Sequence, residues 1–185
     1  MLSLPRENFR SPLALICFGL TAIVGLWLDL WTKDYAFEHL AMYRGTMVVG
    51  SQVRPVIPGW LEITVTTNQG AVFGLGAGQR LLFVSVSLAA ILFLTYLFAN
   101  SGRQRFYQFI LGLLLAGVLG NLYDRIVFGY VRDMIHALPK WGVFPWIFNV
   151  ADVMLCSGVG LMVLYSLLHS GREPEVDLGE KNKPK

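Results

Sequence analysis

Four long stretches of this sequence are almost free of charged residues, and they restrict the possible folds more than any other feature. Residues 11–28, 81–99 and 106–123 contain no charged residue, and residues 141–168 are interrupted only by Asp152. A helix that crosses a bilayer needs about 20 mainly apolar residues. Helices of a soluble bundle carry polar stripes at the helical period, and these stretches do not. The sequence predicts four transmembrane helices, near residues 11–33, 79–100, 105–127 and 147–169.

The composition supports a membrane protein and excludes other classes. Of the 185 residues, 55% are hydrophobic and 15% are charged, whereas soluble domains carry roughly 25% charged residues. A net charge of +3 is too small for a protein that binds nucleic acid. We expect one membrane domain over residues 1–170 and a flexible, solvated cytoplasmic tail over residues 171–185. The first stretch lacks a small-x-small cleavage site, so we interpret it as a retained helix and not a cleaved signal peptide.

The two long connections between the predicted helices, residues 34–78 and 128–148, differ in their sequence patterns. Residues 61–66 alternate apolar and polar side chains, which is the period of a strand, and residues 46–49 are also β-prone. The connection at 128–148 contains two tryptophans, which suit the bilayer interface. The predicted fold class is therefore an all-α membrane protein. It has a small extracytoplasmic β-sheet within residues 34–78, between helices 1 and 2, and an interfacial segment between helices 3 and 4.

The orientation of the chain follows from the number of spans and from one short turn. Four spans place both termini on one side of the membrane. The turn at residues 100–105 carries Arg103 and Arg105, and short cytoplasmic loops are enriched in Lys and Arg. We therefore predict that both termini face the cytoplasm and that residues 34–78 and 128–148 lie outside.

Polar residues gather near the extracytoplasmic ends of three predicted helices. Ionisable residues at membrane depth are costly and commonly functional. Asp152 stands out, because it follows eleven uncharged residues and precedes another apolar run. A buried carboxylate of this kind must be protonated or paired across helices. The other members of this set are Asp29 and Lys33, spaced to share a helix face, then Asn121, Asp124, Arg125, Asp133 and Asn149.

A second carboxylate is the best partner for Asp152. Two facing carboxyl groups cannot both ionise cheaply, so they share one proton. One group then acts as a base and the other as an acid at the same pH. Such a pair can activate water and polarise a peptide carbonyl without a metal or a cofactor.

Five short motifs occur in order between residues 29 and 152. They are Asp29-Leu-Trp-Thr-Lys33, Asn68-Gln-Gly-Ala-Val-Phe73, Gly120-Asn-Leu-Tyr-Asp124-Arg125, Val131-Arg-Asp133 and Phe148-Asn-Val-Ala-Asp152. In this order, on a chain with four spans, they resemble the motifs of the bacterial lipoprotein signal peptidases (signal peptidase II), which are intramembrane aspartic proteases. The chain departs mildly from that family at Val72 and Met134, where Ala and Phe are usual. The segment between Lys33 and Asn68 is longer than in many members.

The resemblance implies a role for each matching residue. It assigns catalysis to Asp133 and Asp152, and it implies that Asp29, Lys33 and Asp124 hold helices 1 and 3 in register. Residues expected to line or support the site are Asn68, Gly70, Asn121, Arg125, Asn149 and Ala151. We further expect the turn at Asn68 and Gly70 to hold the substrate backbone, because Gly70 lacks a Cβ and Asn68 offers a donor and an acceptor.

The resemblance also implies a substrate and a location. The substrate is a prolipoprotein whose lipobox Cys carries diacylglycerol, and cleavage falls just before that Cys. The protein is expected in the bacterial cytoplasmic (inner) membrane, with its active site on the extracytoplasmic face. The implied partners are this substrate and membrane lipid, without nucleic acid, metal or cofactor, and we expect a monomer.

Three other functions are compatible with parts of the sequence. A small ion or proton carrier would use Asp29, Asp124 and Asp152 as relay residues, but these acids lie at one membrane face and no inverted repeat is evident. A structural scaffold does not explain Asp152. A metal site including Asp133, His136 and Asp152 would require residues 133–136 to be helical, so that Asp133 and His136 share a face.

The predicted orientation is tested by cysteine labelling. A cysteine introduced at Gln52 is expected to react with a membrane-impermeant thiol reagent added to spheroplasts, because the connection at 34–78 lies outside. A cysteine introduced at Glu180 is expected to react only after lysis. The parent chain is the control, since Cys17 and Cys156 both lie in apolar stretches. Labelling with the opposite pattern would place the polar face in the cytoplasm.

Overall fold

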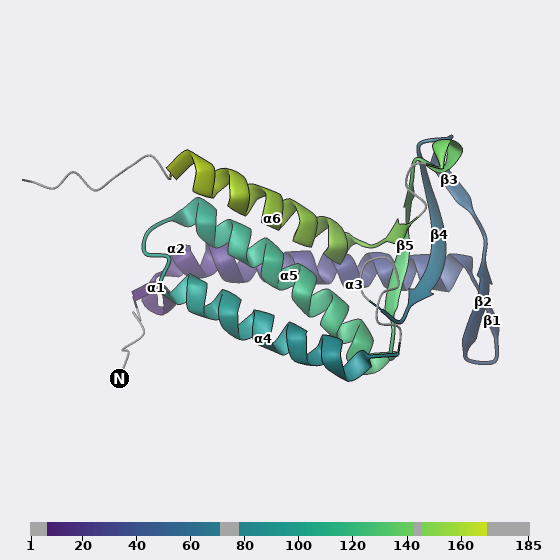
Figure 1. Cartoon of the computed structure of the whole chain (residues 1–185), viewed down its shortest axis with the longest axis horizontal. Helices are drawn as coiled ribbons and strands as arrows, with labels where there is room; N and C mark the ends of the chain where they lie inside the picture. The colour runs from purple at the N-terminus through teal and green to yellow at the C-terminus, as the bar shows by residue number, and fades with distance from the viewer. Residues whose placement is uncertain (1–6, 71–77, 143–145, 170–185) are drawn as a thin grey trace, which may run out of the picture.

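Four long helices lie side by side, and two small β-sheets cover one end of the bundle (Figure 1). This computed structural model describes residues 7–70, 78–142 and 146–169. Four helical stretches are long and apolar enough to cross a membrane: Pro12–Leu40, Arg80–Ala99, Arg105–Val127 and Val150–His169. The four helices expected from the sequence are therefore confirmed, and their ends differ at two places.

The first span consists of three consecutive helical pieces. A short helix α1 (Glu7–Arg10) precedes α2 (Pro12–Leu15), a π-helical turn η1 (Ile16–Leu20) and the long helix α3 (Thr21–Leu40). The prediction that this helix ends near residue 33 is wrong. Ala36, Phe37 and Leu40 keep the helical spacing and are buried in a cluster with strand residues. This packing against the sheet extends α3 beyond the expected span.

The other long helices are α4 (Arg80–Ala99), α5 (Arg105–Val127) and α6 (Val150–His169). Helix α5 is the central helix of the bundle. Of its most apolar stretch, 56% is buried inside the protein, whereas the buried share of the corresponding stretch is 22% or less in the other three helices. The beginning of the described chain, the α4–α5 turn and the end of α6 lie at the end of the bundle away from the sheets (Figure 1). At that end the buried side chain of Asn8 donates to the carbonyl oxygens of Phe98 and Ala99.

The sheets are larger than the sequence predicts. Their strands come from both long connections, the one between α3 and α4 and the one between α5 and α6. Strands β1 (Ala41–Arg44) and β2 (Met47–Ser51) form an antiparallel hairpin. The second sheet has the order β3-β4-β5-β6, and all its neighbours are antiparallel. Its strands are β3 (Arg54–Ile57), β4 (Leu61–Asn68), β5 (Val131–Ala137) and β6 (Ile147–Phe148). The strand expected at residues 61–66 is confirmed within β4.

The connection between α5 and α6 therefore needs a correction. The sequence predicts an interfacial segment there, but two of its pieces, β5 and β6, join the sheet, and a short 3-10 helix η3 (Pro139–Trp141) lies between them. Helix α6 begins at Val150 and not near residue 147, because Ile147 and Phe148 pair with β5. The register between β4 and β5 places Thr66 opposite Asp133 and Asn68 opposite Val131.

Glycines allow the helices to approach closely. A methyl group on Gly25 of α3 would lie 2.7 Å from the Cβ of Ala116 in α5. A methyl group on Gly112 would lie 2.6 Å from the carbonyl oxygen of Phe18 and 2.9 Å from the Cβ of Thr21. Small residues at such contacts are typical of helix packing in membranes. Gly160 on α6 differs, since nothing lies within 4 Å of the position that a methyl group would take there.

This difference yields a matched pair of stability measurements. Gly112→Ala is expected to lower the free energy of unfolding by about 1–3 kcal/mol, because the added methyl meets backbone that cannot move aside. Gly160→Ala is expected to change it by less than about 1 kcal/mol, because its methyl enters open space and Ala favours a helix. Unfolding in detergent micelles measures both values. Equal stability of the two variants would contradict the close contact at Gly112.

Candidate active site

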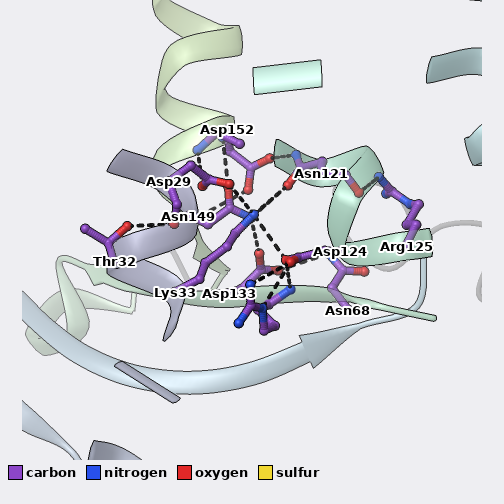
Figure 2. A network of polar contacts seen from close by, with 12 residues as sticks. Asp29, Thr32, Lys33, Asn68, Asn121, Asp124, Arg125, Asp133, Asn149 and Asp152 are labelled. Atoms are coloured by element: carbon purple, nitrogen blue, oxygen red, sulfur yellow. Dashed lines mark hydrogen bonds and ion pairs between the residues drawn. The ribbon is translucent and has the colours of Figure 1, made fainter. Parts of the chain in front are cut away.

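The polar residues of the spans meet the second sheet in one network. Figure 2 shows side chains from α3, α5 and α6 pointing toward one another, with side chains from β4 and β5 beneath them. Every site residue predicted from the sequence and drawn there belongs to this network. They are Asp29, Lys33, Asn68, Asn121, Asp124, Arg125, Asp133, Asn149 and Asp152.

Lys33 lies at the centre of this network and is fully buried. Its Nζ lies 2.7 Å from Asp29 Oδ2, 3.2 Å from Asp124 Oδ2 and 3.2 Å from the Oδ1 of Asn121. The predicted pairing of Asp29 with Lys33 along one helix face is thus confirmed. Asp29 and Asp124 are also 0% exposed. A single ammonium therefore joins α3 to α5 through two carboxylates and one amide.

Asp29 extends the network to α6. Its Oδ1 accepts a hydrogen bond of 2.8 Å from the backbone N–H of Ala151, in the first turn of α6. A side chain on Gly120 would collide with the Asp29 carboxylate, so this glycine keeps α5 close to α3. Ala151 contributes its backbone N–H to the network and is fully buried.

Arg132 is a charged member of the network that the sequence analysis did not identify. It donates to Asp124 from its backbone N–H at 2.9 Å and from its Nε at 3.0 Å, and it also pairs with Asp34. Its guanidinium lies 4.3 Å from the ring centre of Phe128. The signal in the sequence was its place directly before Asp133. These contacts fasten the start of β5 to α3 and α5.

Asp133 and Asp152 are joined through one residue, Asn149. Asn149 Nδ2 donates to Asp133 Oδ1 at 2.6 Å, and the backbone N–H of Asn149 donates to Asp152 Oδ2 at 3.2 Å. In return, the N–H of Asp152 donates to Asn149 Oδ1 at 2.9 Å. The two reciprocal bonds form a capping box at the start of α6. The helix cap therefore also orients both carboxyl groups.

Each carboxyl group has a second amide donor from a different element. Asn68 Nδ2, on β4, donates to Asp133 Oδ2 at 3.2 Å. Asn121 Nδ2, on α5, donates to Asp152 Oδ1 at 2.9 Å, while its Oδ1 accepts from Lys33. Lys33 is thus connected to Asp152 through one amide side chain. These contacts fix the orientation of both carboxyl planes.

The two carboxyl groups differ in their environments. Asp133 is 2% exposed, whereas Asp152 is partly exposed. Burial, together with the negative charge of Asp152, raises the pKa of Asp133 from 3.8 to about 7, against the opposing effects of Asn149, Asn68 and Lys33. Asp133 therefore binds and releases a proton near neutral pH, which a group acting in acid–base chemistry requires.

Gly70 and Arg125 hold the end of β4 against α5. The N–H of Gly70 donates to Asn68 Oδ1 at 2.9 Å, and Arg125 donates to the Gly70 carbonyl at 2.9 Å. The Arg125 guanidinium also lies 4.9 Å from the ring centre of Phe83 in α4. The remaining part of this motif, including Val72, lies outside the described residues.

The metal site considered from the sequence required residues 133–136 to be helical, and the structure does not show a helix there. Residues 133–136 form part of a strand, so Asp133 and His136 point to opposite faces of the sheet. His136 instead contacts Glu62 of β4, with 2.8 Å between its Nδ1 and the carboxylate. Within residues 7–70, 78–142 and 146–169, no three His, Cys, Asp or Glu side chains are grouped to hold a metal ion.

Comparison with known proteins identifies similar sequences and structures. A family model described as signal peptidase (SPase) II matches residues 21–168. The lipoprotein signal peptidase of Syntrophus aciditrophicus is 40% identical over 157 residues, which cover 81% of this chain and 91% of that protein. That of Desulfitobacterium hafniense is 33% identical over 156 residues, covering 82% and 99%. A bacterial membrane enzyme solved by the in meso method at 2.3 Å superposes with a TM-score of 0.71 at 32% identity, covering 89% and 93%.

The buried ammonium predicts a specific stability pattern. Lys33→Met is expected to destabilise the protein by about 3–5 kcal/mol, because it leaves two buried carboxylates without this counterion. Adding Asp29→Asn to Lys33→Met is expected to recover part of that loss, since Asn can still accept from Ala151 but carries no charge. Unfolding of the single and double variants in detergent measures the difference. A double variant less stable than Lys33→Met would contradict the proposed charge balance.

Proposed function

Because the chain belongs to the signal peptidase II family, we propose that Asp133 and Asp152 are its catalytic pair. The family assignment makes the chain a membrane protease that removes signal peptides from lipoprotein precursors. The observation that carries the proposal is the joint contact of both carboxyl groups with Asn149, at the junction of the bundle and the sheet. The pKa of Asp133, which burial and the charge of Asp152 raise to about 7, suits general acid–base hydrolysis.

The difference in burial supports a division of roles within the pair. Asp133, the more buried group, carries the shared proton and donates it to the carbonyl oxygen of the scissile peptide bond. Asp152, which is partly exposed, takes a proton from the attacking water. The tetrahedral intermediate then collapses as Asp152 passes the proton that it took from water to the leaving nitrogen, while Asp133 takes back a proton from one hydroxyl of the intermediate, so that the C–N bond breaks and both carboxyl groups return to their starting states. The donors on both carboxylates keep this geometry before substrate arrives, which reduces the cost of reorganisation.

The position of the pair supports a membrane-bound substrate. Asp133 lies on β5 and Asp152 lies in the first turn of α6, and these elements meet at the end of the bundle that the sheets cover (Figure 1). A signal peptide that lies in the bilayer as a helix presents its end at this depth. We propose that the substrate is a prolipoprotein whose Cys carries diacylglycerol and that the bond before this Cys is cleaved. The lipid and the signal helix together hold that bond beside the two carboxyl groups.

The location follows from the same arrangement. The protein is a bacterial inner-membrane protein with several spans, as the family and the four helices indicate. We propose that both termini face the cytoplasm and that the catalytic pair faces outward. The Arg-bearing α4–α5 turn lies at the end of the bundle away from the pair, as short cytoplasmic turns would.

The contacts of Asn68 support a role other than the one expected from the sequence. Both ends of its amide are already engaged, since Nδ2 contacts Asp133 and Oδ1 accepts from Gly70. We therefore propose that Asn68 orients the carboxyl group of Asp133 and favours its ionised form, in place of holding the substrate backbone.

The catalytic assignment is tested by isosteric substitution. Asp133→Asn and Asp152→Asn are each expected to abolish cleavage of a purified prolipoprotein, because Asn can neither donate an acidic proton nor accept one. Glu62→Gln is a matched control, since its carboxylate lies on β4 and contacts His136 instead. Intact unfolding profiles in detergent verify folding. Near-normal turnover by either Asn variant would disprove that residue's role.

The pH dependence gives an independent check. Cleavage by the wild-type chain is expected to fall as pH rises through about 7, because Asp133 loses the proton that it must donate. Asn68 favours ionisation of Asp133, so Asn68→Ala is expected to raise the pKa of Asp133 and move this decline to higher pH. A pH–rate profile for both chains measures the shift. An unchanged profile with weaker substrate binding would restore the substrate-holding role of Asn68.

A further inference from the structure

A groove separate from the catalytic pair lies along α3. Its volume is about 540 Å³, and its walls come from α3, β3, β4, β5 and the start of α6. Trp31 and Tyr35 in its lining follow Asp29 and Lys33 by two residues each, so they point about 200° away from the ion-pair network. We name it the α3 groove, which is lined by Trp31, Tyr35, His39, Arg54, Val56 and Val150 among others.

The α3 groove combines apolar walls with positive charge. Among the residues that the structure describes, its lining includes Arg54 and His39 and no carboxylate. Arg54 is exposed, and its guanidinium makes no hydrogen bond or ion pair with the described residues. His39 Nδ1 lies 2.8 Å from the carbonyl oxygen of Tyr35, which can only accept, so this nitrogen carries a proton. The α3 groove therefore places the cationic guanidinium of Arg54 and the imidazole of His39 beside apolar walls.

A row of aromatic side chains leads from the apolar part of α3 to the groove. Trp27, Trp31, Tyr35 and His39 stack at successive spacings of four residues, with ring centres 5.9, 6.0 and 4.3 Å apart. Trp27 is 59% exposed and Trp31 is 52% exposed, within a span that is long and apolar enough to cross the membrane. Trp and Tyr side chains favour the region between acyl chains and headgroups. The row therefore connects the groove to the surrounding lipid.

We propose that the α3 groove binds one anionic phospholipid of the surrounding bilayer. The lipid phosphate contacts Arg54, whose planar guanidinium suits phosphate geometry. The acyl chains lie along the aromatic row formed by Trp27 and Trp31. The positive charge of Arg54 selects an anionic lipid over one with a zwitterionic headgroup, because no carboxylate among the described lining residues would hold a choline or an ammonium group.

Bound lipid would also support the strands that carry the site. Arg54 lies on β3, which pairs with β4, and β4 ends at Asn68. Met134, which lines the groove, follows Asp133 directly on β5. A lipid in the groove therefore packs against two strands that position Asp133.

Tryptophan quenching tests the proposal without substrate. The purified chain in detergent is titrated with phosphatidylglycerol or phosphatidylcholine that carries brominated acyl chains. We expect saturable quenching by phosphatidylglycerol, and loss of much of it in Trp31→Phe. Arg54→Gln is expected to weaken the apparent affinity for phosphatidylglycerol roughly tenfold, the loss typical of a charge-assisted contact. Arg54→Lys is expected to retain only part of the affinity, because it keeps the positive charge but loses the planar pair of donors.

Arg44→Gln is the matched control, because Arg44 is an exposed arginine on β1 that does not line the groove. Equal weakening by Arg44→Gln and Arg54→Gln would overturn the proposal in favour of general surface attraction. Equal affinity for the two lipids, or quenching that does not saturate, would also overturn it. Stoichiometric displacement of phosphatidylglycerol by a diacylglyceryl peptide would assign the groove to substrate instead.

Discussion

The buried ammonium of Lys33 is the interaction on which the arrangement of the site depends. Lys33 and Arg132 supply two positive charges, and Asp29 and Asp124 supply two negative charges, all of them buried. A buried charge is tolerated only when it is paired and hydrogen-bonded. This charge balance therefore fixes α3 against α5 and holds the start of β5 against both helices. Asp133 and Asp152 can occupy fixed positions because the elements that carry them are held together in this way.

The pair is assembled from elements that are distant in the sequence. Asp133 lies on a strand, Asp152 lies in the first turn of a membrane helix, and Asn149 connects them as the cap of that helix. A helix cap normally satisfies free backbone N–H groups. Here the same residue also fixes the orientation of both carboxyl groups. The cap of α6 and the orientation of the two carboxyl groups therefore depend on one residue, Asn149.

Sequence reasoning identified most residues of the polar network but not the way in which they connect. The pairing of Asp29 with Lys33 was predictable, because residues four apart share a helix face. The position of Asp152 in an apolar run predicted a polar partner. Arg132 was missed, because its place before Asp133 does not by itself distinguish a buried arginine in a strand from one exposed to solvent. The contact of Asn68 with Asp133 was not predictable, because it depends on the register between β4 and β5.

The sequence by itself determined the four spans and the set of polar residues near one end of them. Hydropathy and helical spacing are local properties, and the cost of exposing backbone or charge to lipid leaves few alternatives. The tertiary structure alone decided that α3 continues to Leu40, that β5 and β6 join the sheet, and that Asn149 bridges the two carboxyl groups. Strand pairing and the burial of a helix end depend on partners far away in the chain, as in the contact between Asn68 and Asp133. No local pattern encodes such partners, so they are settled only when the chain packs.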